Sequence, residues 1–118
     1  MSKQTFIVDG VRTPIGNFGG ALSSVRADDL AAFAIKSLLD RHPNLDCEQI
    51  EDVIMGCGTP EGATGQNVGR LAAIWAGCPV TTSGVTVNRC CSSGLQTIAM
   101  AAGRVVNEGA SAVIGAGV

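Results

Sequence analysis

The stretch GVTVNRCCSSGLQTIAMAAG, residues 84–103, runs from an alternating apolar segment through a polar turn with two adjacent cysteines into a second apolar segment. Residues 84–88 alternate as a strand does, and residues 93–107 place apolar side chains at helical spacing. A residue in the sharp turn between a strand and the next helix lies near the carboxyl edge of a parallel sheet, where such folds bind ligands. The stretch therefore predicts a strand–turn–helix unit that exposes one side chain.

The remaining sequence continues the alternation of strand and helix patterns on both sides of this unit. Strands are predicted at residues 4–11, 52–57 and 84–88, with a fourth starting at 112–114, and helices at 28–42, 66–76 and 93–107. Parallel strands need crossover connections, so this order predicts an α/β fold with a largely parallel sheet and helices on both faces. We expect one unit, residues 1–118, truncated after its fourth strand.

Each predicted helix carries a stripe of apolar residues that we expect to face the sheet. The stripes comprise Leu30, Phe33, Ala34, Ser37 and Leu38 in the first helix, Val68, Leu71, Ala72 and Trp75 in the second, and Leu95, Ile98, Ala99, Ala102, Val105 and Val106 in the third.

Composition excludes several classes of partner. Apolar residues make up 46% of the chain and glycine is abundant, with 16 residues, which is typical of closely packed helices on a sheet. The net charge of −2 comes from scattered acids and bases, so neither nucleic acid nor an anionic membrane is an expected partner. The sequence shows no leader pattern and no apolar run of bilayer length, and we therefore expect a soluble, cytoplasmic protein.

Five cysteines are present, and their spacing predicts neither a disulfide framework nor a metal site. They show no paired CxxC units and no histidine in metal-ligand spacing. Reduced thiols in a reducing compartment are usually small buried apolar groups and sometimes nucleophiles. We expect Cys47, Cys57 and Cys78 to be structural.

The two adjacent cysteines are expected to differ. Cys91 lies just before Ser92, Ser93 and Gly94, so the first free N–H groups of the helix would face its sulfur and stabilise a thiolate. Strand alternation would turn Cys90 to the opposite side, as a packing residue. Alternatively, both are small buried residues and the serine pair is a helix cap, and the local pattern does not decide between these readings.

Residues 88–96, NRCCSSGLQ, resemble the acyl-enzyme signature of the thiolase family, with Cys91 on the nucleophile and Cys90 on a variable position. The resemblance extends to VRTPIG at 11–16 with FGG at 18–20, and to DVIMG at 52–56 followed by GQN at 65–67. It covers essentially the whole chain and is closest to degradative 3-ketoacyl-CoA thiolases, which are acetyl-CoA C-acyltransferases. It implies that residues 1–118 form part of a thiolase amino-terminal domain.

The resemblance also implies a reaction. Cys91 would carry an acyl thioester during cleavage of 3-ketoacyl-CoA, with no bound cofactor, with acyl-CoA and coenzyme A as ligands, and in a homodimer or homotetramer built around residues 84–88. The family's remaining catalytic groups, a His in Gly-His-Pro and a Cys in Cys-x-Gly, belong to its carboxyl-terminal half. The only histidine here, His42, precedes Pro43 at a helix end and is expected to be a solvated loop residue or a partner of the helix dipole. We therefore expect the isolated chain to be inactive.

Two alternatives remain open at this point. One is a ketoacyl-synthase-like condensing enzyme, whose nucleophile also has a Cys-Ser-Ser context, although Asn88 and Arg89 fit it poorly. The other is a non-catalytic α/β interaction module whose apolar helix faces pair with a partner.

Overall fold

A three-stranded parallel sheet forms the middle layer of the structure, a computed structural model that describes residues 3–118. Strand β1 (Ile50–Gly56) lies in the centre, between β2 (Ser83–Val87) and β3 (Ala112–Gly117). Both neighbours pair with β1 in parallel. Residues 52–57 are buried throughout, as expected for a central parallel strand covered on both faces.

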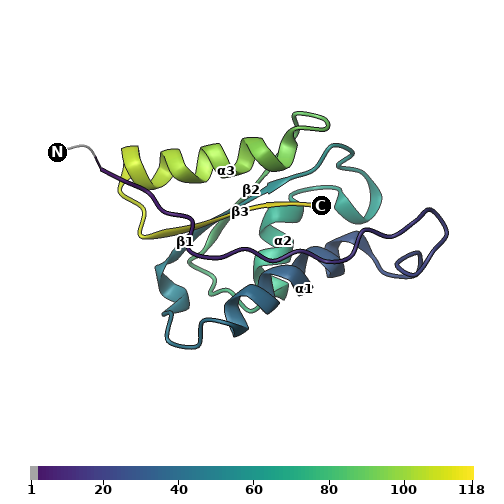
Figure 1. Cartoon of the computed structure of the whole chain (residues 1–118), viewed down its shortest axis with the longest axis horizontal. Helices are drawn as coiled ribbons and strands as arrows, with labels where there is room; N and C mark the ends of the chain where they lie inside the picture. Colours follow the sequence, from purple (N-terminus) through teal and green to yellow (C-terminus); the bar gives the residue numbers. More distant parts are fainter. Residues whose placement is uncertain (1–2) are drawn as a thin grey trace.

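Helices cover both faces of this sheet (Figure 1). Helices α1 (Ala27–Asp40) and α2 (Val68–Trp75) lie on one side. On the other side lies α3 (Ser93–Gly103), which continues into a π-helical turn, η3 (Arg104–Glu108). Two single 3₁₀ turns, η1 (Cys47–Gln49) and η2 (Gly62–Thr64), complete the described elements. The predicted α/β fold is confirmed, and within residues 3–118 no helix is long and apolar enough to cross a bilayer.

The predicted first strand is wrong. Residues 4–11 make no sheet pairing, and Phe6, Ile7 and Val8 are more than three-quarters exposed. The β-branched composition of this segment fits a strand, but a strand exists only when a neighbouring edge accepts its hydrogen bonds. The described sheet therefore has three strands rather than four.

Side-chain bonds from Asp9 hold this segment against the end of α1. The Asp9 carboxylate lies 2.8 Å from Nε2 of His42 and 3.1 Å from a guanidinium nitrogen of Arg41. Hydrogen bonding from His42 and from the Gly10 amide, helped by the Arg41 charge, holds the pKa of Asp9 below its ordinary value. His42 is thus a half-buried partner of Asp9 at the end of α1, and of the two roles expected from the sequence the solvated loop residue is wrong.

The predicted apolar stripes are right only in part. Val68 and Ala72 of α2 are buried as predicted, but several large stripe residues are turned outward while smaller neighbours are buried. Phe33 of α1 is 63% exposed, while its neighbours Ala31 and Ala32 are buried. The same holds for the other two helices. Buried residues outside the predicted stripes include Ala73 in α2 and Thr97 and Ala101 in α3, whereas exposed stripe residues include Leu71, Trp75, Leu95 and Ile98.

Close approach of the backbones explains this inversion. A Cβ atom on Gly69 of α2 would lie 2.4 Å from the carbonyl oxygen of Val85 in β2, and one on Gly84 of β2 would lie 2.5 Å from the Cα of Arg70. On the opposite face, a Cβ on Gly115 of β3 would lie 3.1 Å from backbone atoms of Ile98 in α3. Only small residues fit where helix and strand are this near.

Candidate functional site

Cys91 lies in the turn between the end of β2 at Val87 and the start of α3 at Ser93. The carboxyl ends of all three strands meet beside this turn. The amide of Cys57, just after β1, donates to the carbonyl of Val87, and the amide of Val118, just after β3, donates to Gly56, both at 2.9 Å. Cys91 therefore lies at the carboxyl edge of the parallel sheet, as the sequence predicts.

Two glycines let the turn pack directly onto the end of β1. A Cβ on Gly56 would lie 2.6 Å from the carbonyl carbon of Ser93 and 2.7 Å from its oxygen. A Cβ on Gly58 would lie 3.3 Å from the carbonyl oxygen of Cys90. The position of Cys91 relative to the sheet is thus fixed by backbone contact rather than by long side chains.

Cys90 departs from its predicted role. It is exposed, and its φ of 46° lies in the left-handed region that a residue with a Cβ seldom adopts. The strand alternation that assigned it to packing ends at Val87, before the turn begins. Backbone strain of this kind clusters at functional sites, where surrounding bonds maintain it.

A set of short hydrogen bonds maintains this turn. The side-chain oxygen of Asn88 accepts from the Cys90 amide at 2.9 Å. The carbonyl of Arg89 accepts from both the amide and the hydroxyl of Ser92, at 3.1 and 3.0 Å. The carbonyl of Cys90 likewise accepts from the amide and the hydroxyl of Ser93, at 3.2 and 2.6 Å. These bonds present Cys91 on a rigid loop.

The environment of Cys91 agrees only in part with the expectation. Its side chain is exposed, as a nucleophile requires, and it stands two residues before an eleven-residue helix. The amides of Ser92 and Ser93, however, donate their hydrogen bonds to carbonyls of the turn and not to the sulfur. What remains of the expectation is the position of Cys91 just before the amino-terminal, positive end of the α3 dipole.

Two of the other three cysteines pack into the apolar core. Cys57 and Cys78 are buried in the cluster beneath α1 and α2, and Cys47 is half-buried. Burial raises the pKa of the Cys78 thiol, and the neighbouring Cys47 acts in the same direction. A buried thiol with a raised pKa is a poor nucleophile, which leaves Cys90 and Cys91 as the exposed thiols.

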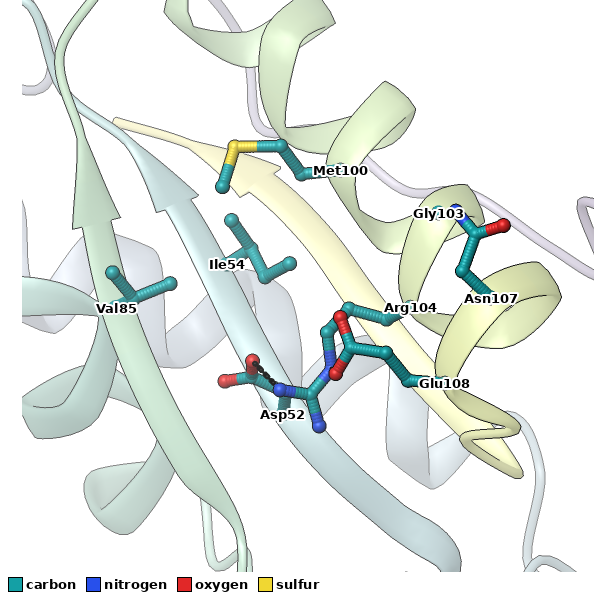
Figure 2. Close-up of a pocket in the computed structure, with 8 residues that line it drawn as sticks. All are labelled: Asp52, Ile54, Val85, Met100, Gly103, Arg104, Asn107 and Glu108. Atoms are coloured by element: carbon teal, nitrogen blue, oxygen red, sulfur yellow. Dashed lines mark ion pairs between the residues drawn. The ribbon is translucent and has the colours of Figure 1, made fainter.

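A hollow of about 410 Å³ lies away from Cys91, between β1, β2 and the end of the α3 segment (Figure 2). Its polar side consists of Asp52, Arg104, Asn107 and Glu108, and Ile54, Val85 and Met100 form the apolar side. Asp52, which is 5% exposed, lies 3.5 Å from Arg104. No sequence pattern predicts this pair, because its two residues are brought together only by the packing of the α3 segment on the sheet. The hollow lies near the start of β1, whereas Cys91 lies near the carboxyl ends of the strands, at the opposite edge of the sheet.

Replacing Arg104 by Leu should destabilise the fold by about 2 kcal/mol, because the Asp52 carboxylate would stay buried without its cation. The partial exposure of Arg104 keeps the cost below that of a fully buried pair. Urea unfolding measures the change, and adding Asp52→Val should recover most of it. Lys36→Leu is the matched control, since it breaks an exposed ion pair with Asp40 and should cost little. A double variant less stable than Arg104→Leu alone would refute this account of the pair.

Comparison with known proteins shows which protein family the chain matches. A family profile described as "Thiolase, N-terminal domain" matches residues 5–118. The 3-oxoadipyl-CoA/3-oxo-5,6-dehydrosuberyl-CoA thiolase of Escherichia coli K12 is 53% identical over 107 residues, covering 91% of this chain and 26% of that protein.

Two further relatives carry related names. The beta-ketoadipyl-CoA thiolase of Pseudomonas knackmussii is 45% identical over 118 residues, which is 100% of this chain and 29% of that protein. The 3-ketoacyl-CoA thiolase of Bacillus subtilis is 46% identical over 105 residues, which is 88% of this chain and 27% of that protein. The chain thus spans little more than a quarter of the length of these relatives.

Proposed function

The chain belongs to the thiolase family, and we propose that the full-length protein is a 3-ketoacyl-CoA thiolase, an acetyl-CoA C-acyltransferase, whose nucleophile is Cys91. The observation that carries this proposal is the placement of an exposed Cys91 on a hydrogen-bonded turn at the carboxyl edge of the sheet, directly before α3. Cys91 lies at the position where parallel sheets bind ligands, and its thiol is the group that thioester chemistry needs.

The proposed reaction has two half-reactions. The Cys91 thiolate attacks the 3-keto carbonyl of the substrate, the carbon–carbon bond breaks, and acetyl-CoA leaves while the shortened acyl group stays on sulfur. The thiol of a second coenzyme A then takes the acyl group and regenerates Cys91. Coenzyme A is a substrate in this scheme, not a resident cofactor. The departing enolate needs a proton and a stabilised oxygen, which are tasks for further groups.

Residues 3–118 offer no imidazole for these tasks at Cys91. Their single histidine, His42, is bound to Asp9 at the end of α1. The family resemblance implies a His in Gly-His-Pro and a Cys in Cys-x-Gly for these tasks, and residues 1–118 contain neither motif. We therefore expect residues 1–118 alone to show no thiolysis, while thiolysis by the purified chain would contradict this.

The relatives suggest which substrate to test first. Two of them are named for 3-oxoadipyl-CoA or beta-ketoadipyl-CoA, which are 3-ketoacyl thioesters with a free carboxylate at the far end of the acyl chain. A third is named for 3-ketoacyl-CoA in general. We propose a 3-ketoacyl-CoA as the substrate class, with the dicarboxylic members tested before the unbranched monocarboxylic ones of fatty acid β-oxidation.

We further propose that the full-length protein is a cytoplasmic homodimer or homotetramer in which β2 lies at the interface between copies. Within residues 3–118, β2 pairs only with β1, so its outer edge is open. Exposed apolar side chains lie on and around it, among them Val80 and Val85, and Trp75 at the end of α2. Open strand edges beside apolar surface favour association. A light-scattering measurement that shows the full-length protein to be a monomer would contradict this proposal.

A limiting dose of iodoacetamide should modify Cys91 first in the full-length protein. A thiolate reacts faster than a thiol, and Cys91 combines exposure with its position before α3. Site-resolved mass spectrometry follows the order of labelling, with exposed Cys90 as the internal control for access alone and buried Cys57 as the control for protection. Equal labelling of Cys90 and Cys91 would show that exposure, not an activated sulfur, governs the reaction.

A further inference from the structure

The hydroxyl of Ser93 joins the two sides of the turn that carries Cys91. It accepts a hydrogen bond from the Arg89 amide at 2.9 Å and donates one to the Cys90 carbonyl at 2.6 Å. Ser93 is only 4% exposed, so water does not compete freely for these bonds. A single buried side chain thus fixes the backbone from the amide of residue 89 to the carbonyl of residue 90.

Serine at a helix start ordinarily caps the helix, but here the hydroxyls serve the preceding turn. Ser92, the residue before the first turn of α3, makes no side-chain cap bond and donates backward to Arg89. Ser93, the first residue of α3, also bonds backward. A capping hydroxyl would instead accept from an amide two or three residues ahead. The sequence alternative that made this serine pair a helix cap is therefore wrong.

The turn needs this support because Cys90 stands in a left-handed conformation with φ at 46°. A residue with a Cβ persists there only when its surroundings hold it. The Ser93 hydroxyl donates a hydrogen bond to the Cys90 carbonyl, and the side-chain oxygen of Asn88 accepts one from the Cys90 amide. These two bonds hold Cys90 in this conformation. The conformation of Cys90 in turn sets the direction in which the next side chain, Cys91, leaves the backbone.

We propose that Ser93 is a positioning residue for the Cys91 sulfur. By holding Cys90 in its left-handed conformation, Ser93 aims Cys91 at the acyl carbon of the substrate without touching the reacting atoms. This inference rests on the proposed nucleophilic role of Cys91. It predicts that loss of the hydroxyl affects the rate of acyl transfer more than substrate affinity, since only the aim of the nucleophile changes.

The test uses the full-length protein with Ser93→Ala. We expect kcat for thiolysis to fall about 100-fold with KM little changed, the loss typical of a slightly misplaced reacting group. The rate of iodoacetamide labelling at Cys91 should fall relative to that at Cys90. Thr97→Ala is the matched control, because Thr97 is buried in the same helix and bonds the Ala116 carbonyl of β3 rather than the turn. It should lower the melting temperature yet leave kcat and the labelling ratio near their original values.

A second substitution distinguishes positioning from general loosening. Adding Cys90→Gly to Ser93→Ala should restore kcat by about tenfold, because glycine adopts the left-handed conformation without help. Unchanged kcat in Ser93→Ala, an equal loss in Thr97→Ala, or no recovery with glycine would each overturn the proposal. If thiolysis instead survives Cys91→Ala, the proposed function fails, while the labelling ratio still reports whether Ser93 positions Cys91.

Discussion

Thiolysis by the full-length protein should fall at least about a thousandfold when Cys91 is replaced by Ala, because covalent catalysis is lost with its nucleophile. The substitution removes one exposed sulfur from the turn and leaves the hydrogen bonds of Asn88, Ser92 and Ser93 intact. We therefore expect an unchanged melting temperature. Initial rates with a dicarboxylic 3-ketoacyl-CoA and coenzyme A measure the loss.

Cys90→Ala is the matched control for this prediction. Cys90 is also exposed, lies in the same turn, and keeps its Cβ and left-handed backbone after the change. Its thiolysis rate should stay close to that of the unmodified protein. If Cys90→Ala loses activity and Cys91→Ala keeps it, the assignment of the two sulfurs is reversed, and if both keep it, neither is the nucleophile.

Gly56→Ala should produce the second large effect, a destabilisation of about 3 kcal/mol together with loss of thiolysis. The new methyl group would lie 2.6 Å from the carbonyl carbon of Ser93 and 2.8 Å from the Gly94 amide nitrogen, so the start of α3 must move away from β1. Both neighbours are backbone atoms that cannot turn aside as a flexible side chain would. Since Cys91 immediately precedes this point, the movement would displace the nucleophile as well. Urea unfolding and initial rates measure the two effects.

Gly94→Ala is the control for stability. It adds the same methyl group one residue into the first turn of α3, where nothing lies within 4 Å and no positive φ is required. Alanine also favours helix over glycine, so the stability should be unchanged or slightly higher. A Gly56→Ala protein as stable as Gly94→Ala would show that α3 does not pack on β1 as described.

Much of the fold could be predicted from the sequence because the informative signals are local. The central strand, the three helices and the turn at Cys91 follow from hydrophobic periodicity and from the order of strand and helix patterns. The first strand could not be predicted correctly, since residues 4–11 have strand composition but pair with neither edge of the described sheet. Strand propensity says nothing about the presence of a partner.

The helix faces were mispredicted in part, for a different reason. Choosing the larger apolar residues as the buried ones ignores how closely a helix can approach a sheet that presents glycine. The sequence does contain glycines that indicate this close approach, namely Gly69 on α2 and Gly84 and Gly115 on the strands. They bring the backbones together and exclude large side chains between them. Trp75 of α2 and Leu95 of α3 are therefore left exposed.

For the candidate site, the sequence placed Cys91 correctly at the carboxyl edge but not the bonds that hold it there. The left-handed Cys90 interrupts the strand alternation, and no local pattern predicts which way the Ser92 and Ser93 hydroxyls turn. The ion pair of Asp52 with Arg104 also depends on tertiary packing alone. These are contacts between backbone and side chains whose geometry exists only after folding.

The most direct test of the proposed nucleophile is the acyl-enzyme itself. The full-length protein is mixed with a 3-ketoacyl-CoA in the absence of free coenzyme A, quenched in acid and digested with trypsin, which releases the peptide of residues 90–104. Fragmentation of this peptide should place one acyl group on Cys91 and none on Cys90, and coenzyme A added before the quench should remove it. An acyl group on any other cysteine, with Cys91 unmodified, would contradict the account.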